Sequence, residues 1–304
     1  MGIINSISEF HQLLHLPEPL HPLVSVIRVA DMRFKDNVIW EHFSFNFYCV
    51  SAKKTIWAKV KYGQQYYDYN KGVMSFVSPN QFQSLDIPQT DLLNPEFGTG
   101  YVLVVHPDFL YKHSLAATIK DYGFFSYSVN EALHLSEKEE KNVLELFQKI
   151  EEEYQYIDKH TQDIILSQIE MLLSYSNRFY ERQFITRKAV NHDVLTRMDQ
   201  LLNEYFNQEE SLKKGLPTVE SIASQLNLSP HYLSDLLRSF DGQNAQQHIH
   251  EKLIQKAKEY LTATNLSVAQ IAYQLGFEYP QSFNKLFKKK MNISPLEFRQ
   301  TFNH

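Results

Sequence analysis

Short runs of apolar residues alternate with turn-forming residues over the first third of the chain. The runs are rich in β-branched and aromatic side chains, as in "FNFYCV" and "GYVLVVH", with Lys35-Asp36-Asn37 and Ser78-Pro79-Asn80 between such runs. Several short strands at this spacing are typical of a β-sandwich or small barrel. Asn70-Lys71-Gly72, between "YYDY" and "VMSFV", predicts a hairpin turn.

Helical periodicity replaces this pattern after His106-Pro107. Ser136 followed by Glu139 is a capping box and predicts a helix start. Its apolar face is formed by Val143, Leu146, Phe147 and Ile150. A second helix begins near Asp158 and carries a broad apolar stripe of Ile164, Ile165, Ile169, Leu172, Leu173 and Tyr175. Such helices pack on each other or on a partner subunit, and we favour a dimer contact through one of them.

The polar stretch 184–193 predicts a linker between two domains. Residues 1–183 form the β domain with its helices at about 136–183. Residues 194–304 have helical character throughout, beginning with a helix that places Val194, Met198, Leu201, Leu202 and Tyr205 on one side. The predicted fold class is therefore multidomain α+β, with an N-terminal β-sandwich or barrel and a C-terminal all-α domain.

Two segments near the end of the chain repeat one pattern, "IASQLNLSPHYLSDLLRSF" and "IAYQLGFEYPQSFNKLFKKK". Both begin Ile-Ala-x-Gln-Leu, break four residues after the alanine, at Asn227 and Gly276, and open a second helix near a proline. Bulky residues then recur four apart at Leu233 and Leu237 and at Phe283 and Phe287. The repeat predicts two helix pairs of the same design.

Each shared feature of the repeat has a physical reason. Ala223 and Ala272 are small enough for two helices to cross closely. The residue at the break takes a positive φ, which Gly adopts freely and Asn tolerates better than most residues. Ser229-Pro230 joins an N-cap to a proline at the first helical position, which is a strong helix start. Because the bulky residues face the core, the polar side chains of each second helix should face outward.

This pattern is typical of the helix-turn-helix, whose second helix is available to the major groove of DNA. One such match is weak, since many all-α proteins contain similar helix pairs, but two in tandem are much stronger. The predicted partner is double-stranded DNA, read as two elements about 34 Å apart if the connecting helix is rigid. The predicted DNA-binding residues are Ser229, His231, Tyr232, Ser234, Arg238, Tyr279, Gln281, Ser282, Asn284, Lys285 and Lys288.

Lysines outside these positions allow two interpretations. On the connecting helix, which should bury Leu253, Ile254, Ala257 and Leu261, we expect Lys252, Lys256 and Lys258 to be exposed. At the end of the last repeat, Lys288, Lys289 and Lys290 either neutralise phosphates, which makes binding salt-dependent, or form an ordinary solvated face.

The tandem motif resembles the DNA-binding domain of AraC/XylS-type transcriptional regulators. The resemblance rests on "TVESIASQLNLSPHYLSDLLRSF", "QHIHEKLIQKAKEYL" and "LSVAQIAYQLGFEYPQSFNKLFKKKMNISPLEFR". More loosely, "MSFVSPNQFQSL" followed by helices resembles the cupin-like sensory domain of that family. The resemblance implies a cytoplasmic bacterial regulator, more often an activator, that dimerises, contacts RNA polymerase and responds to a small-molecule effector of unknown identity. The alternative is a regulator without an effector, controlled by a protein partner or by its own level.

Two positions depart from the family pattern. Asn292 stands where the family usually has glycine before Ser-Pro, and Asn can adopt the same backbone conformation. Asp235 stands in the first recognition helix where many members carry a basic residue. An acid there repels phosphate but can accept a hydrogen bond from cytosine N4, so the first motif either contributes less affinity or reads a different base.

Composition adds two constraints. The formal net charge is −5, yet residues 212–304 carry 11 Lys and Arg against 7 Asp and Glu. Such asymmetry hints at a nucleic-acid-binding end, although ordinary scatter produces it too. Cys49 is the only cysteine, which excludes an intramolecular disulfide and fits a reducing compartment. Because no window approaches the ~20 apolar residues of a membrane span, we expect no membrane association.

We expect no enzymatic activity, cofactor or metal site. The chain lacks a Gly-rich phosphate loop, G-x-S-x-G and H-E-x-x-H. The H-x-H pair His248-Ile249-His250 falls on a predicted helix, where side chains two apart point in different directions. Cys49 lies in an apolar strand-like run, which favours burial over reactivity.

Two further questions stay open from the sequence. A helical scaffold for protein partners is a rival function, but its binding faces should be more apolar than these. In the β domain, aromatic residues either line an effector pocket or pack in the core, namely Trp40, Phe45, Phe47, Trp57 and Tyr66. No effector-binding residue is therefore assigned.

Overall fold

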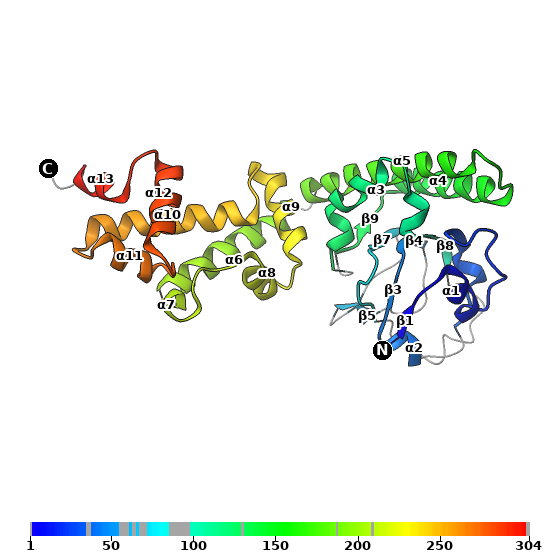
Figure 1. Ribbon diagram of the computed structural model, residues 1–304, viewed down its shortest axis with the longest axis horizontal. Coiled ribbons are helices and arrows are strands. Elements are labelled where there is room, and N and C mark those ends of the chain that lie inside the picture. The colour runs from blue at the N-terminus through cyan, green and yellow to red at the C-terminus, as the bar shows by residue number, and fades with distance from the viewer. Residues whose placement is uncertain are drawn as a thin grey trace. The chain divides into compact units, whose positions relative to one another are not determined.

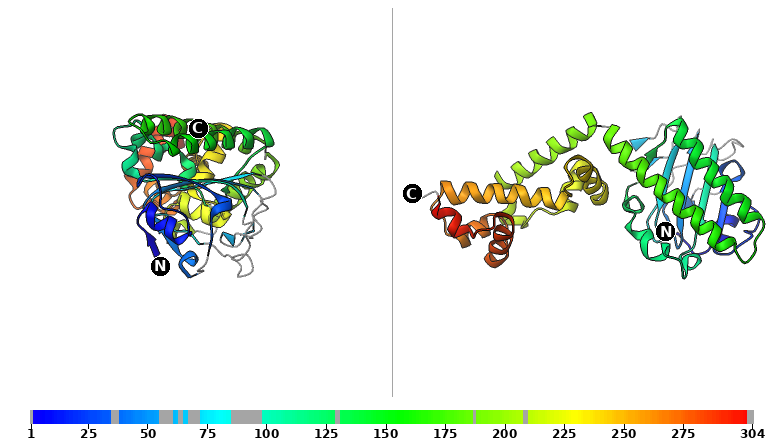
Figure 2. Two further views of the ribbon diagram at one scale, coloured as in Figure 1. Left: turned by 90° about the vertical axis from the view of Figure 1, so that its right-hand side faces the viewer. Right: turned by 90° about the horizontal axis from the view of Figure 1, so that it is seen from above.

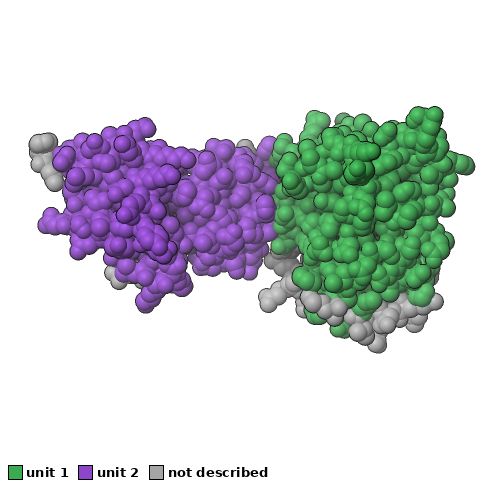
Figure 3. Space-filling model, viewed as in Figure 1, with its two compact units in different colours: residues 1–183 green, residues 184–304 purple. Residues whose placement is uncertain are grey.

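The computed structural model describes residues 2–34, 38–54, 61–62, 65–66, 72–84, 98–128, 131–186, 188–207 and 210–301. The chain divides into two compact units, residues 1–183 and 184–304 (Figure 3). The first contains sheets and helices and the second is helical (Figure 1), which confirms the predicted α+β class at this level. The stretch predicted as a linker is largely helical, since α5 (Thr161–Thr186) ends inside it and α6 (Lys188–Asn207) begins there.

Residues 1–183 combine nine short strands with five helices in the part of this unit that is described. The strands are β1 (Gly2–Ile4), β2 (Val24–Arg28), β3 (Phe43–Phe45), β4 (Tyr48–Lys54), β5 (Lys61–Tyr62), β6 (Gln65–Tyr66), β7 (Val73–Val77), β8 (Thr99–Val105) and β9 (Leu133–His134). The helices are α1 (Ile7–Leu13), α2 (Val38–Glu41), α3 (Leu115–Thr118), α4 (Glu137–Gln155) and α5. Short 3₁₀ turns cover 29–31, 107–110, 119–121 and 123–126.

The main sheet has five antiparallel strands in the order β2-β8-β4-β7-β9. In its centre Val50 of β4 lies opposite Phe76 of β7 and Leu103 of β8. β1 pairs in parallel with β3, and β5 pairs with β6. Four of the apolar runs in the sequence thus form β2, β4, β7 and β8, as predicted. Asn70 and Lys71 of the predicted hairpin turn lie outside the described residues.

One face of the main sheet packs on an aromatic core. Phe10 of α1 contacts Trp40, Phe45 and Phe47, with ring centroids 6.3, 5.2 and 5.7 Å away. These rings are buried with Cys49, and burial raises the pKa of the Cys49 thiol to about 11. Three of the five candidate effector-lining aromatics are therefore core residues. Trp57 and the side chain of Tyr66 lie outside the described part of the chain.

The opposite face of the sheet is covered by α4 and α5, which lie side by side across the strands (Figure 2). Tyr101 of β8 stacks on Phe147 of α4 with centroids 5.5 Å apart. The predicted apolar faces are buried at Val143, Leu146, Phe147, Ile150, Ile165, Ile169, Leu172 and Leu173. Ile164 instead is 40% exposed, because it lies one position outside the face that meets the sheet. No helix among the described residues is long and apolar enough to cross a membrane.

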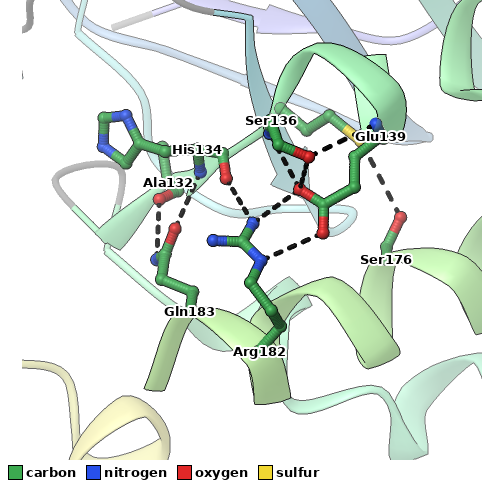
Figure 4. A network of polar contacts seen from close by, with 8 residues as sticks. Ala132, His134, Ser136, Glu139, Ser176, Arg182 and Gln183 are labelled. Atoms are coloured by element: carbon green, nitrogen blue, oxygen red, sulfur yellow. Dashed lines mark hydrogen bonds and ion pairs between the residues drawn. The ribbon is translucent and has the colours of Figure 1, made fainter. Parts of the chain in front are cut away.

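A polar network joins the start of α4 to the end of α5 (Figure 4). The predicted capping box is present, with the Ser136 backbone N–H donating to Glu139 at 2.8 Å. Arg182 donates to the Glu139 carboxylate through Nε at 3.0 Å and Nη2 at 2.8 Å, and also to the His134 carbonyl. Gln183 accepts from the His134 N–H and donates to the Ala132 carbonyl. We call Glu139, Arg182 and Gln183, with β9, the α5 clasp.

Replacing Glu139 with glutamine should destabilise residues 1–183 by about 1.5–3 kcal/mol at neutral pH, because a charged group loses its hydrogen-bond partner. Burial opposes ionisation here, but the hydrogen bonds from Ser136 and Arg182 outweigh it and lower the pKa of Glu139. A lowered carboxyl pKa contributes stability that is lost as the pH falls below the ordinary glutamate value of about 4.3. The difference between wild type and Glu139→Gln should therefore shrink below that pH.

The measurement is urea denaturation followed by tryptophan fluorescence, since both tryptophans, Trp40 and Trp57, lie in residues 1–183. Glu137→Gln, at an exposed position in the same helical turn, is the matched control. If the difference in free energy of unfolding between Glu139→Gln and wild type stays constant from pH 7 to pH 3, the ionisation of Glu139 does not contribute to stability.

Residues 184–304 form eight helices in the described part, counting α6, with the end of α5 leading into them. After α6 these are α7 (Glu210–Lys214), α8 (Val219–Leu226), α9 (Pro230–Asp241), α10 (Ala245–Ala263), α11 (Val268–Gln274), α12 (Pro280–Met291) and α13 (Pro295–Gln300). The long helix α10 connects α8–α9 to α11–α12 and buries Leu253, Ile254, Ala257 and Leu261, as predicted.

Candidate nucleic-acid interface

Two helix pairs of the same geometry, α8–α9 and α11–α12, form the candidate interface. Each first helix ends in the same hydrogen-bonded turn. In the first copy the N–H groups of Asn227 and Leu228 donate to the carbonyls of Ser224 and Ala223 at 3.1 and 2.9 Å. In the second copy the corresponding distances are 2.9 and 3.0 Å. Asn227 has φ 57° and Gly276 has φ 92°, which confirms the positive φ predicted at both breaks.

The apolar residues of the repeat form the contacts within each pair. Ala223 and Ala272 have no exposed surface, which fits their predicted role at a close helix crossing. Buried beside them are Leu233, Leu237, Phe283 and Phe287. Phe283 and Phe287 also contact each other, with ring centroids 5.7 Å apart. Asn292 ends α12 at φ 61°, so asparagine takes the conformation that the sequence analysis assigned to it.

The second helix of the second pair presents a polar surface to solvent. Tyr279 is the N-cap of α12, makes no side-chain cap hydrogen bond and is 59% exposed. All other residues predicted for this helix are exposed as well, namely Gln281, Ser282, Asn284, Lys285 and Lys288. We call these six residues the α12 face. They combine hydrogen-bonding side chains with two positive charges, the chemistry that base edges and phosphates require.

The second helix of the first pair presents fewer of the predicted residues. His231 and Arg238 are exposed and Ser234 is partly exposed. The outward orientation predicted for two residues, Tyr232 and Ser229, is wrong. Tyr232 is only 6% exposed, and its ring contacts Phe184 with centroids 5.1 Å apart. Ser229 is 7% exposed because its hydroxyl caps α9 by accepting from the Tyr232 N–H.

The burial of Tyr232 also follows from the width of the apolar face of α9. Leu236 of α9 is buried together with Leu233 and Leu237, so the apolar face extends to position 232. In α12 the corresponding position is Ser282, which is exposed. The first recognition helix therefore offers a narrower polar surface than the second.

Asp235 and Arg238 form an ion pair on the exposed side of α9. Arg238 is thus the positive charge of this helix, and it is paired with Asp235 one turn earlier. The pair is partly solvated, with 51% of the Arg238 side chain and 28% of the Asp235 side chain exposed. Pairs of this kind are worth at most about 1 kcal/mol, so DNA can compete for Arg238.

The lysines of α10 are not the free surface charges expected from the sequence. Lys252 Nζ lies 2.7 Å from Asp199 Oδ1, and only 10% of its side chain is exposed. Lys256 Nζ lies 2.8 Å from Glu259, and Lys258 lies over the ring of Phe298 at 5.9 Å. Lys252 thus joins α10 to α6, Lys256 does so through the Asn207 side chain, and all three lysines are only partly exposed.

The lysines at the end of α12 are different. Lys290 lies 3.8 Å from Glu251, whereas Lys288 and Lys289 are exposed and make no ion pair within 4.0 Å among the described residues. Burial lowers the pKa of His250, and the nearby charges of Lys290 and Lys289 lower it further. Positive potential therefore gathers where α12 ends against α10.

A contact between the segment that precedes α8 and the end of α11 was not predicted from the sequence. Tyr205 and Phe206 of α6 are buried in the core around α11–α13. Tyr205 Oη donates to the Gly215 carbonyl at 3.0 Å, and Ser211 Oγ donates to the Gln274 carbonyl at 2.7 Å. A Cβ on Gly276 would lie 2.5 Å from the Gly215 carbonyl oxygen, so the two backbones touch. Two glycines alone give no signal of such a contact in a sequence.

Within the described residues no group of three or more His, Cys, Asp or Glu gathers as metal ligands. The two histidines of the H-x-H pair contact different partners. His248 Nε2 lies 3.2 Å from Asp241 Oδ2, and His250 contacts Gln246.

Comparison with known proteins gives matches at this end of the chain. A family model described as a helix-turn-helix domain matches residues 222–301. Regulatory protein PocR of Salmonella typhimurium is 32% identical over 85 residues, which are 28% of this chain and 28% of PocR. The HTH-type transcriptional activator RhaS of Salmonella schwarzengrund is 29% identical over 139 residues, or 45% of each protein. The solved C-terminal domain of AraT, a response regulator from Geobacillus stearothermophilus, is 31% identical, covering 36% of this chain and 84% of that one, with a TM-score of 0.31.

The chain thus spans less than half the length of these two curated relatives. The repeated helix pairs and the matching family model define the class, a tandem helix-turn-helix protein. Its C-terminal part is an AraC-type helix-turn-helix domain, and this part is similar to the corresponding parts of PocR and RhaS.

Proposed function

We propose that this protein is a sequence-specific DNA-binding regulator of transcription that inserts α9 and α12 into adjacent major grooves. The observation that carries the proposal is the α12 face, six exposed polar residues on the second helix of a helix-turn-helix. The packing of α6 and α10 on both helix pairs supports it further, because the recognition helices then meet DNA at a fixed separation. The relative RhaS is named a transcriptional activator, which favours activation as the role of this protein. RNA polymerase would then be a partner.

The proposed roles of residues 1–183 are sensing and dimerisation. We infer a cupin-like domain that responds to a small molecule. Control by a protein partner or by the level of the regulator is the alternative. The exposed apolar residues Ile164 and Met171 lie seven apart on α5 and so share a face, which supports a homodimer contact through this helix.

Selection of bound sequences from a random DNA pool at two salt concentrations, with the full chain, tests the function. Enrichment of a site with two short elements about one helical turn apart is the expected result. The absence of any binding above background at low salt would overturn the proposal.

Lys288→Ala should weaken DNA binding to a similar extent for all sequences and reduce the slope of log Kd against log salt by about 1. The reason is that Lys288 is exposed and makes no ion pair with the described residues, so it can neutralise one phosphate. Lys256→Ala is the matched control, since this lysine is already held by Glu259 and Asn207. Equal slopes for wild type and Lys288→Ala would mean that Lys288 does not contact a phosphate.

A further inference from the structure

A cavity of about 370 Å³ lies between one end of the main sheet and the first half of α4. Ala52 of β4 and Tyr101 of β8 form part of its floor, and Leu135, Val143 and Leu144 contribute apolar walls. This volume is within the range of pockets that bind small molecules, about 300–1,000 Å³. No residue of the predicted DNA interface lines it.

Two glycines, Gly72 and Gly100, lie at the edge of this cavity and allow close contacts there. Gly100 has φ 122°, and a Cβ there would lie 2.0 Å from the Ala52 carbonyl oxygen. A Cβ on Gly72 would lie 3.0 Å from the carboxyl carbon of Glu140, so glycine lets this α4 side chain reach over the sheet. Glycine at position 72 thus leaves room for the Glu140 side chain at the cavity.

The charges around the cavity indicate what it can hold. Glu140 and Lys53 are the acidic and basic residues among those that line it. Lys53 follows Ala52 on β4, so its side chain points to the opposite face of the sheet, the face of Cys49. Glu140 is thus the charge on the cavity side. A carboxylate has about four acceptor sites, so it can take a further hydrogen bond beside those it already makes.

The cavity adjoins the α5 clasp. Leu135 and Glu140, which line it, flank the capping box Ser136–Glu139, and Arg182 holds Glu139 (Figure 4). The Leu135 N–H also donates to the Gly72 carbonyl at 2.9 Å. Immediately after Arg182 and Gln183 the chain continues into residues 184–304. An occupant would therefore press on residues next to those that fix the last turns of α5.

We propose that this cavity binds a small, mainly apolar molecule with an amine at one end, the amine donating to Glu140, and that the α5 clasp transmits its presence to the DNA-binding unit. The transmission rests on the function proposed above; the binding does not. The larger hollow of about 730 Å³ beside His11 is a weaker candidate, because two of the charged groups that line it, Arg28 and Glu151, already pair with each other at 2.7 Å.

Two probes of equal size and opposite charge, phenethylamine and phenylacetate, test the binding on the full chain by ligand-observed NMR and calorimetry. Phenethylamine should bind, with at least a tenfold preference over phenylacetate. Leu144→Trp should abolish binding, since Leu144 is partly exposed and a larger side chain there can fill the cavity without disturbing the core. Glu140→Gln should weaken binding at least fivefold. Glu145→Gln, at an exposed position of α4 that does not line the cavity, should leave binding unchanged.

Equal binding of the two probes, or binding of phenethylamine that survives Leu144→Trp, would overturn the site. For transmission, saturating phenethylamine should change the Kd for a selected DNA site at least threefold, and Arg182→Ala should abolish this change while probe binding persists. An unchanged Kd in a wild-type chain that binds both probe and DNA would overturn transmission alone. A chain that binds the probe but no DNA would instead refute the proposed function.

Discussion

Replacing Gly276 with alanine is expected to destabilise the C-terminal unit by about 2–6 kcal/mol and to abolish specific DNA binding. Two costs combine. A residue other than glycine at φ 92° is strained by about 1–3 kcal/mol. The new Cβ would also lie 2.5 Å from the Gly215 carbonyl oxygen, and relief of an overpacked contact costs about another 1–3 kcal/mol. Because that contact is between backbones, no side-chain rotation can relieve it.

Gly242→Ala separates these two costs. Gly242 follows α9 at φ 80°, and a Cβ there would meet nothing within 4 Å. This variant should therefore lose only the conformational part, about 1–2 kcal/mol. The measurement is loss of helical circular dichroism in urea, with tryptophan fluorescence as an internal control for residues 1–183. Equal destabilisation by the two substitutions would mean that the contact between Gly215 and Gly276 contributes nothing.

The features that the sequence predicted correctly are those encoded within a few neighbouring residues. Ser136 with Glu139 and Ser229 with Pro230 mark helix starts through hydrogen bonds that span three residues. Asn227 and Gly276 mark helix ends through their own backbone angles. The spacing of Phe283 and Phe287 likewise defines the buried side of α12 without reference to any other element.

The features that it predicted wrongly depend on residues far away in the chain. Tyr232 is buried because Phe184, 48 positions earlier, lies against it. Lys252 is not a free charge because its ammonium group donates a hydrogen bond to Asp199, 53 positions earlier. Helical periodicity gives the direction of a buried face, but its width is decided by the partner that covers it. The order of strands in the main sheet is equally non-local, since β8 lies between β2 and β4.

Replacing Asp235 with asparagine should change the DNA sequence that α9 selects and raise overall affinity. In the wild type Asp235 carries a negative charge on the recognition surface and holds Arg238. Aspartate accepts from cytosine N4, whereas a free arginine pairs with guanine O6 and N7. The variant removes the charge and releases Arg238. One element of the selected site should therefore lose a preference for cytosine and gain one for guanine, with about 1–3 kcal/mol of discrimination.

Selection from a random pool with wild type and Asp235→Asn, followed by Kd measurements on the two selected sites, checks this prediction. Lys285→Ala on the α12 face is the matched control, because it should alter the other element and leave the α9 element as it is in wild type. Identical selected sites for wild type and Asp235→Asn would mean that α9 contacts DNA without reading bases. The narrower polar surface of α9, where Tyr232 and Ser229 are buried, would then leave sequence recognition to α12.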